Sequence, residues 1–276
     1  MNRKMDREGH QSLAGRSALI TGGARNIGLA IAKEMASRGV TVAIADSCHD
    51  LETVPYALAS ADQLARAVDE LTRLEGRAIG MLCDVRDEGQ VQETVDRVIQ
   101  EFGHLDILVN NAGVGSLYPI QELTEKAWNE VVDVCLKGTF LCSKFAVPPM
   151  IRQRTGRIIN IASVAGLRGL GFSAHYCAAK HGVIGLTRAL AVELADHGIQ
   201  VLAVCPGTVE SPSLQGLASQ VGLEVNPYEH FSQRHLLKDR RITPRDIAEA
   251  VCWLASGECR CLTGTILTVD AGWTAQ

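Results

Sequence analysis

The stretch that decides the fold reads SALITGGARNIG and runs from Ser17 to Gly28. Its first five residues, Ser17–Thr21, form a short apolar run, which is typical of a strand buried on both faces of a sheet. A glycine-rich turn follows and leads into a segment with Ile27, Ile31 and Met35 at helical spacing. A strand, a glycine-rich turn and a helix in this order predict the opening of a βαβ unit.

The rest of the chain repeats this alternation. Six more runs rich in Val, Ile and Leu follow: Val40–Ala45, Ala78–Cys83, Leu105–Asn110, Arg157–Ile161, Ile199–Cys205 and Thr265–Val269. Segments of helical length and spacing are Ile27–Arg38, Glu88–Phe102, Thr124–Pro148, His175–Ala195 and Pro244–Ala255. Seven strands interleaved with helices predict an α/β fold: one doubly wound, Rossmann-type domain whose seven-stranded parallel sheet carries helices on both faces.

Composition excludes several classes of protein. The 276 residues are 46% apolar and 21% charged, as in an ordinary globular chain, and the net charge of −4 argues against a nucleic-acid binder. No apolar stretch is long enough for a membrane span, so we expect a cytoplasmic protein. The nine cysteines contain no C-x-x-C pair and are expected to be buried and reduced, with no metal site. We expect residues 1–13 to be a polar extension and 14–276 the domain.

The glycine-rich turn predicts a site for a dinucleotide. Glycine lets the backbone turn tightly and approach a pyrophosphate, and the helix that follows directs free N–H groups at it. Asp46 ends the next predicted strand, where an acid binds the ribose hydroxyls of NAD and repels the extra phosphate of NADP. Asp46 also fits a carboxylate that caps a turn. We expect cofactor contacts from Gly22, Arg25, Asn26, Ile27, Gly28 and Asp46.

Two further loops follow predicted strands and are expected at the same edge of the sheet. Asp84 and Val85 follow the third strand, where they would meet the adenine amine and ring. Asn111, Ala112 and Gly113 follow the fourth strand. Ligands of such sheets bind at the carboxyl ends of the strands, where the strand order reverses. Asn111 fits cofactor binding and a purely structural bridge between strands equally well.

A tyrosine and a lysine provide a candidate catalytic group. Tyr176 and Lys180 are four residues apart, which places both on one face of a helix. A nearby ammonium and a bound nicotinamide ring favour the phenolate, so we expect the tyrosine pKa of about 10 to fall. Tyr176 would then take the hydroxyl proton of an alcohol. Ser163, just after the fifth strand, would hydrogen-bond the substrate oxygen.

Taken together, these motifs resemble the classical short-chain dehydrogenase/reductase family from Ala14 to Trp273. The resemblance rests on TGGARNIG, Asp84, NNAG, Ser163 and the Tyr176–Lys180 pair. It implies hydride transfer to or from a nicotinamide, and a homotetramer. It also implies that Pro206, Gly207 and Thr208 hold the nicotinamide amide and that Tyr176 and Lys180 contact the cofactor.

A narrower resemblance is to the carveol-dehydrogenase-like, mycofactocin-associated members. It rests on the segment that begins DSCHDLETVPYALAS at Asp46 and on AHYCAAKHGVIGLTRALAVEL. In those relatives the inserted piece, here about residues 47–60, folds over the adenosine end of NAD, and the cofactor is hard to exchange. The extra length from Asp46 to Asp84 also fits an ordinary surface loop.

Two positions depart from the family pattern. Asn26 stands where a second glycine is usual, and asparagine tolerates the left-handed backbone region better than other residues. Cys135 stands where the resemblance implies the asparagine of the catalytic tetrad. Cysteine is a weak hydrogen-bonding group and does not replace an amide. The exchange is mild if the backbone carbonyl holds a relay water beside Lys180, and slows proton release if the amide is needed.

The substrate is expected under residues 208–241, which are apolar and contain no clear strand. This segment fits a mobile lid over a hydrophobic or alicyclic alcohol, or ordinary packing between subunits. Arg168 is the one candidate that favours an anionic substrate. We therefore expect an NAD-dependent oxidoreductase of secondary alcohols and ketones. The alternatives are a nicotinoprotein whose fixed NAD passes electrons to an external acceptor, and a non-catalytic dinucleotide-binding scaffold.

Overall fold

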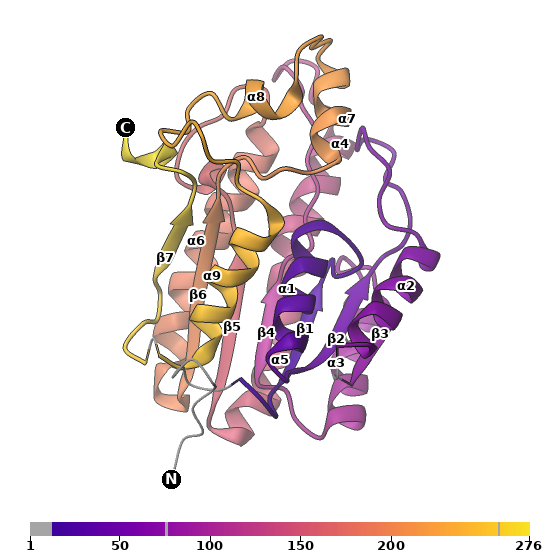
Figure 1. The fold of residues 1–276 in the computed structure, drawn as a ribbon, viewed down its shortest axis with the longest axis vertical. Helices are drawn as coiled ribbons and strands as arrows, with labels where there is room; N and C mark the ends of the chain where they lie inside the picture. The colour runs from indigo at the N-terminus through magenta and orange to yellow at the C-terminus, as the bar shows by residue number, and fades with distance from the viewer. Residues whose placement is uncertain (1–12, 75–76, 259) are drawn as a thin grey trace.

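A parallel sheet of seven strands forms the middle layer of the fold (Figure 1). The structure is a computed structural model, and it describes residues 13–74, 77–258 and 260–276. Most of the expected N-terminal extension, residues 1–12, lies outside the described residues. The strands are β1 (Ser17–Thr21), β2 (Thr41–Asp46), β3 (Ala78–Leu82), β4 (Ile107–Asn110), β5 (Gly156–Ile161), β6 (Ile199–Pro206) and β7 (Ile266–Val269).

The strand order is β3-β2-β1-β4-β5-β6-β7, so the prediction of a doubly wound parallel sheet is confirmed. The chain moves outward from β1 to β2 and β3, and then returns to place β4 on the other side of β1. The connections after β1 and β4 lead to helices on opposite faces of the sheet, which predicts a crevice at its carboxyl edge.

Helices cover both faces. One face carries α1 (Asn26–Ser37), α2 (Ala61–Thr72) and α9 (Pro244–Ser256), and α1 packs directly on α9. The other carries α3 (Glu88–Phe102), α4 (Glu125–Val132), α5 (Gly138–Gln153) and α6 (Ala174–Leu194). Two short helices, α7 (Ser213–Gln220) and α8 (Pro227–Phe231), lie above the carboxyl edge of the sheet (Figure 1).

Side-chain hydrogen bonds mark the starts of α4 and α9, at or within one residue of where the sequence predicts them. The Thr124 hydroxyl accepts the N–H of Ala127 at 3.1 Å and starts α4. Thr243 and Asp246 bond to each other before α9, from the Thr243 N–H and hydroxyl to the carboxylate. These contacts satisfy N–H groups that have no partner inside a helix.

Two helical segments differ from the sequence prediction. The predicted helix Thr124–Pro148 is α4 and α5 joined by a π-helical turn, Asp133–Lys137. It continues past Pro148 to Gln153, because buried residues such as Met150 pack in the core and offset the hydrogen bonds that proline loses. The α2 helix lies inside the long segment for which no helix was predicted.

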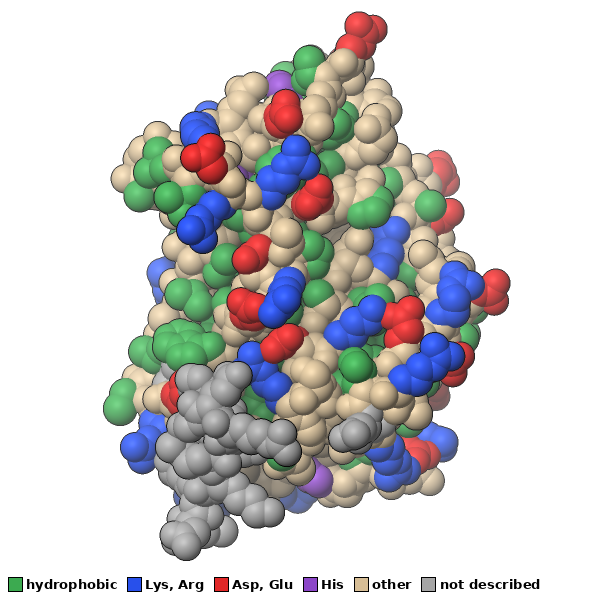
Figure 2. Space-filling view, viewed as in Figure 1, with side chains coloured by type: hydrophobic (Ala, Val, Ile, Leu, Met, Phe, Trp, Pro, Cys, Tyr) green, Lys and Arg blue, Asp and Glu red, His purple; other side chains and the backbone are tan. Residues whose placement is uncertain are grey.

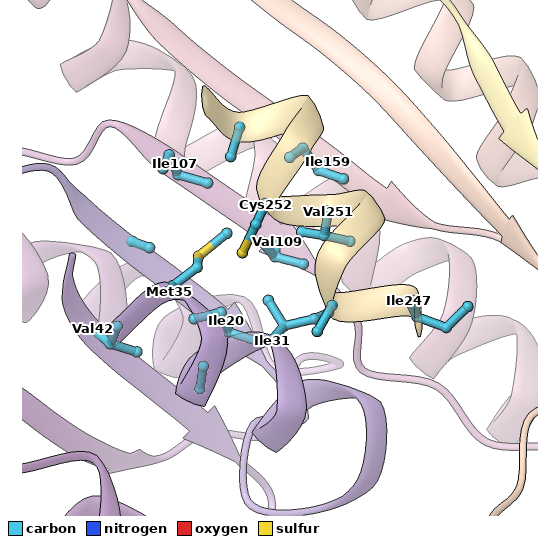
Figure 3. Packing of buried hydrophobic residues seen from close by; sticks show 14 of the residues in the cluster. Ile20, Ile31, Met35, Val42, Ile107, Val109, Ile159, Ile247, Val251 and Cys252 are labelled. Carbon is cyan, nitrogen blue, oxygen red and sulfur yellow. The ribbon is translucent and has the colours of Figure 1, made fainter. Parts of the chain in front are cut away.

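The core between α1, α9 and the sheet is continuous (Figure 3). Met35 and Ile31 of α1 meet Val251 and Cys252 of α9 above the side chains of the sheet. All four are fully buried, and Cys252 packs as the small hydrophobe expected of it. This contact fixes α1, and with it the turn between β1 and α1.

The surface carries no dominant charge on the face shown in Figure 2, where acidic and basic side chains alternate. This agrees with the small net charge of −4. Among the described residues, no helix combines the length and apolar character needed to cross a membrane.

Replacing Met35 by alanine should lower the free energy of unfolding by about 2–5 kcal/mol, because the substitution leaves a cavity between α1 and α9. Urea denaturation of both proteins measures the difference. Gln92→Ala, on the exposed side of α3, is the matched control and should change the value by less than about 0.5 kcal/mol. Equal losses for the two variants would contradict this account of the core.

Candidate active site

The glycine-rich turn after β1 lies tightly against the loop after β4. Gly22 has a φ of +63°, and a Cβ there would lie 2.9 Å from the Cα of Ala112. A Cβ on Gly28 would lie 2.1 Å from the carbonyl oxygen of Gly22. Asn26 adopts a φ of 49°, as expected for an asparagine that replaces glycine. Any side chain at Gly22 or Gly28 would prevent the backbone from packing this closely.

Asn111 joins these two loops. Its amide nitrogen donates to the carbonyl oxygens of Thr21 at 2.9 Å and Gly22 at 3.0 Å. The Thr21 hydroxyl in turn accepts the backbone N–H groups of Asn111 and Ala112, both at 3.1 Å. Of the two interpretations left open by the sequence, these contacts favour the structural bridge.

Asp46 lies at the end of β2 and faces the turn. Its carboxylate accepts the backbone N–H of Ala24 at 3.1 Å. The neighbouring Arg25 turns away from the helix end: its guanidinium donates to the carbonyl of Ala57 at 2.5 Å and lies 6.0 Å from the ring centre of Tyr56. Arg25 therefore holds residues 47–60, the insertion, at the rim of the turn.

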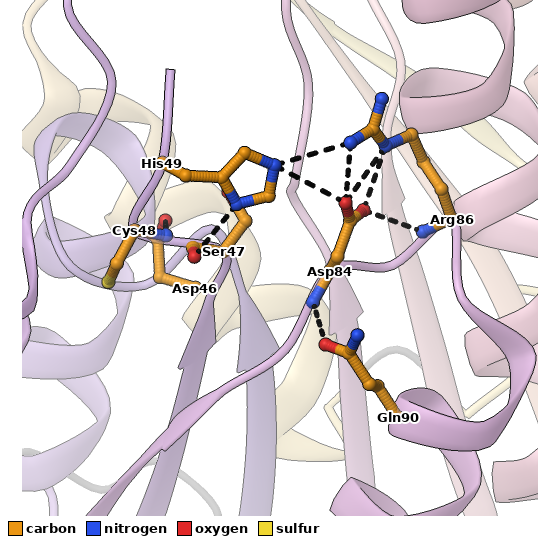
Figure 4. A network of polar contacts seen from close by, with 7 residues as sticks. All are labelled: Asp46, Ser47, Cys48, His49, Asp84, Arg86 and Gln90. Carbon is orange, nitrogen blue, oxygen red and sulfur yellow. Dashed lines mark hydrogen bonds and ion pairs between the residues drawn. The ribbon is translucent and has the colours of Figure 1, made fainter. Parts of the chain in front are cut away.

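Asp84 is part of a polar network that the sequence did not reveal (Figure 4). The Arg86 side chain donates to both carboxylate oxygens, with the shortest distance 2.6 Å, and the Arg86 N–H donates at 3.0 Å. His49 of the insertion lies 3.5 Å away. Burial raises the pKa of Asp84, but the bonds from Arg86 outweigh this and hold it below its usual range. The carboxylate is thus charged and already paired.

A cleft of about 1210 Å³ runs along this edge of the sheet. Every residue that the sequence analysis assigned to the cofactor or to catalysis lines it: Gly22, Arg25, Asn26, Ile27, Gly28, Asp46, Asp84, Val85, Asn111, Ala112, Gly113, Ser163, Tyr176, Lys180, Pro206, Gly207 and Thr208. Residues from opposite ends of the chain are therefore brought to one cavity.

The three candidate catalytic residues converge in this cleft. Ser163 follows β5, and its hydroxyl bonds to Tyr176 and accepts the N–H of Ala165 at 3.1 Å. Tyr176 and Lys180 lie on successive turns of α6, and the Lys180 Nζ is 5.6 Å from the tyrosine ring centre. Lys180 is buried, and its ammonium donates to the carbonyl of Ile161 at 2.8 Å. The lysine is thereby held beside the phenol.

In the chain by itself, the surroundings of Tyr176 oppose ionisation of its phenol. Burial of the phenol raises its pKa above the ordinary value, the neighbouring Cys135 acts in the same direction, and the hydrogen bond with Ser163 lowers it only in part. Lys180 alone therefore does not make the phenol acidic. Additional positive charge in the cleft is required for Tyr176 to act as a base.

Cys135 lies next to Lys180, within the π-helical turn. A Cβ on Gly113 would lie 3.6 Å from both the Cys135 Sγ and the Lys180 Nζ. The thiol donates to the carbonyl of Val114 at 3.3 Å, and the Cys135 carbonyl accepts the Thr139 hydroxyl at 2.8 Å. The cysteine thus occupies the place that the family resemblance implies for asparagine.

Several residues that line the cleft carry no sequence signal. Tyr56 of the insertion accepts the N–H of Gly115 at 2.9 Å, and the Gly115 backbone runs along the ring of Tyr176. Trp273 near the C-terminus also lines the cleft. Only the unusual length of the insertion pointed toward Tyr56, and nothing in the pattern pointed to Trp273.

Comparison with known proteins agrees with this site. The model of the short chain dehydrogenase family matches residues 16–222. The chain is 37% identical to cis-4-hydroxycyclohexanecarboxylate dehydrogenase of Sinomonas cyclohexanicum, covering 96% of this chain and 99% of that one. It is 35% identical to a 3-oxoacyl-acyl-carrier-protein reductase of Thermotoga maritima, over 94% and 98% of the two chains.

Among solved structures, carveol dehydrogenase of Mycobacterium avium in complex with NAD is similar, with a TM-score of 0.90 and 34% identity. The match covers 96% of this chain and 99% of that one. This agrees with the resemblance to carveol-dehydrogenase-like members and with the expectation of NAD. By its sequence, fold and site, the chain belongs to the short-chain dehydrogenase family of oxidoreductases.

Proposed function

We propose that the protein is an NAD-dependent dehydrogenase that interconverts a hydrophobic secondary alcohol and its ketone. The observation that carries this proposal is the convergence of Ser163, Tyr176 and Lys180 in one cleft beside the glycine-rich turn. A buried ammonium fixed one helical turn from a phenol suits proton transfer at an alcohol oxygen.

The residues of the turn fit NAD. The backbone at Gly22 and Gly28 leaves no room for a side chain, and α1 starts directly behind it, so free N–H groups face a pyrophosphate. The carboxylate of Asp46 ends β2, where it would bind ribose hydroxyls and repel a 2′-phosphate. Pro206, Gly207 and Thr208 would hold the nicotinamide end. When bound, NAD supplies the hydride acceptor and a positive ring near the phenol.

The chain's own residues handle the proton. Tyr176 Oη takes the proton of the substrate hydroxyl while the carbinol carbon loses its hydride, so that the alcohol becomes a ketone. The Ser163 hydroxyl donates to the same oxygen and orients it. Lys180, fixed by the Ile161 carbonyl, stabilises the phenolate electrostatically. Since burial opposes ionisation of Tyr176, this role depends on the combined positive charge of the ammonium and the cofactor.

Apolar side chains support a hydrophobic substrate. Residues 208–241, which we propose as the substrate lid, line the outer part of the cleft with Leu214, Leu217, Val221, Leu223 and Phe231. Arg168, the cation that favoured an anionic substrate, donates instead to the carbonyls of Thr274 and Gln276. One similar protein is named for cis-4-hydroxycyclohexanecarboxylate, an alicyclic alcohol that also carries a carboxylate, whereas another is a 3-oxoacyl reductase.

The insertion favours a second candidate, a nicotinoprotein that retains its NAD. Arg25 and Gly115 bond to the insertion from the two sides of the cleft. Thr53 of the insertion donates to Glu130 of α4 through its N–H at 3.0 Å and its hydroxyl at 2.6 Å. We therefore propose that residues 47–60 are a cofactor lid rather than a free surface loop. The homotetramer implied by the family resemblance stays a prediction.

Tyr176→Phe should reduce alcohol oxidation by at least about a hundredfold, because it removes the proton acceptor, while NAD still binds. The assay is NAD reduction on a panel of cyclic and acyclic secondary alcohols, with NAD affinity by calorimetry. Tyr118→Phe is the matched control and should change the rate less than about threefold, because its hydroxyl makes only a 3.4 Å contact with Thr53. An unchanged rate of alcohol oxidation in Tyr176→Phe would contradict the proposed mechanism. Binding of NAD without any turnover would favour the scaffold.

Cys135→Asn should change the turnover number severalfold or less and preserve NAD binding. The reason is that, among the described residues, the Cys135 thiol hydrogen-bonds to the Val114 carbonyl alone, and the asparagine amide can keep that bond. Steady-state kinetics with saturating NAD tests this. A change of more than about a hundredfold would show that the side chain at 135 takes part in proton release.

If the cofactor lid retains NAD, the purified protein will release about one NAD per chain on heating, and added NAD will exchange slowly. Tyr56→Phe should then speed exchange up to about tenfold, because the Gly115 N–H loses its acceptor. Exchange of labelled NAD measures the rate, with Gln92→Ala as control. Rapid exchange in the unaltered protein would favour the freely NAD-dependent dehydrogenase over the nicotinoprotein.

A further inference from the structure

A buried histidine, His235, lies against the loop that we expect to hold the nicotinamide. It belongs to the substrate lid, between α8 and α9, and only 2% of its surface is exposed. Its Nε2 accepts the backbone N–H of Thr208 at 3.2 Å. A backbone N–H only donates, so Nε2 must carry no proton, and the imidazole is neutral with its hydrogen on Nδ1.

The loop formed by Pro206, Gly207 and Thr208 packs closely against His235. A Cβ on Gly207 would lie 2.9 Å from His235 Nε2 and 3.0 Å from the Cα of Asp270, so glycine is needed for the approach. The Thr208 hydroxyl donates to the carbonyl of Phe231 at 2.7 Å. The N–H and the hydroxyl of Thr208 are therefore both bonded to residues in and after α8.

Surrounding rings fix the imidazole in place. Tyr228 of α8 meets it edge-on, with ring centres 6.2 Å apart, and Trp273 lies 5.9 Å away. The Tyr228 hydroxyl accepts the N–H of Ile242 at 2.8 Å, and the Leu236 N–H donates to Ala271 at 2.8 Å. His235 thus joins three parts of the chain: the lid, the C-terminal turn and the loop after β6.

Burial favours the neutral form of the His235 imidazole. Burial lowers its pKa, and Lys238 acts in the same direction, while Asp270 opposes both. Asp270 is itself occupied by the N–H groups of Gly272 and Thr274 and by the Thr274 hydroxyl. Tyr228 also faces the imidazole, and the Arg241 guanidinium carbon lies 5.2 Å from the centre of the Tyr228 ring. If Nε2 were protonated, its N–H and the Thr208 N–H would face each other as two donors, and the hydrogen bond to Thr208 would break.

We propose that His235 is a positioning residue that fixes the Pro206–Thr208 loop against the substrate lid, and so presets the nicotinamide end of the NAD site. The proposal rests on the proposed function only in assigning that loop to the nicotinamide. The Thr208–His235 bond itself is a property of the chain, and it can be measured without any substrate.

Hydrogen exchange of the Thr208 amide tests the bond directly. His235→Leu should raise its exchange rate tenfold or more. His235→Gln should stay close to the unaltered protein, because its Oε1 can accept the same N–H. The amide of Thr41, which donates to Arg16 at 2.8 Å at the amino end of β2, serves as the internal control. Equal exchange at Thr208 in all three proteins would overturn the proposal.

NAD affinity, measured by calorimetry, tests the consequence. We expect His235→Leu to weaken binding about tenfold and His235→Gln less than threefold. His197→Gln, on the exposed turn after α6, should have no effect. If His235→Leu does not fold, the pH dependence decides the matter. Unaltered protein should lose NAD affinity severalfold as the pH falls through the lowered pKa of His235, which lies below the ordinary histidine value, and His235→Gln should not.

The direction of this pH dependence follows from the linkage between protonation and folding. A histidine whose pKa is lowered by folding contributes stability that is present above its unfolded pKa and is lost as the pH falls through its lowered folded pKa. The same pH profile in the unaltered protein and His235→Gln would overturn the proposal. If both bind NAD as expected but no alcohol is oxidised, the proposed function fails and the positioning role stands.

Discussion

The whole site depends on how closely two loops approach at the reversal of the strand order. The turn after β1 and the loop after β4 touch through backbone atoms, and Asn111 bonds across them to Thr21 and Gly22. Any side chain at Gly22 would separate them. The α1–α9 core holds the turn from below, through Met35 and Cys252. The carboxyl edge of the sheet therefore presents a preformed crevice, and the remaining residues only need to reach into it.

Much of this could be predicted from local sequence. Each of the seven strands begins and ends within a residue or two of its apolar run. A short run of Val and Ile bounded by turn residues is typical of a buried strand. The Tyr176–Lys180 pair and Ser163 were found because helical spacing and a strand end place them without any long-range information. The asparagine at 26 adopts the left-handed backbone expected of it.

What the sequence did not reveal arises from contacts between distant segments. Arg86 occupies the carboxylate of Asp84, Tyr56 reaches Gly115, and His235 reaches Thr208, and no periodicity encodes such pairs. The burial of Tyr176 escapes the sequence for a related reason. The spacing to Lys180 is visible in the sequence, but the desolvation of the phenol is a property of the closed cleft.

The two covers of the cleft also touch one another. A Cβ on Gly216 of α7 would lie 2.4 Å from the carbonyl oxygen of Pro55 and 2.8 Å from the Cβ of Tyr56. The α7 helix therefore packs on the insertion at a point where only glycine fits. If residues 208–241 and 47–60 are the two lids that we propose, directed evolution that enlarges position 216 to broaden the range of alcohols would also displace the insertion, so substrate scope and coenzyme retention would change together at that point.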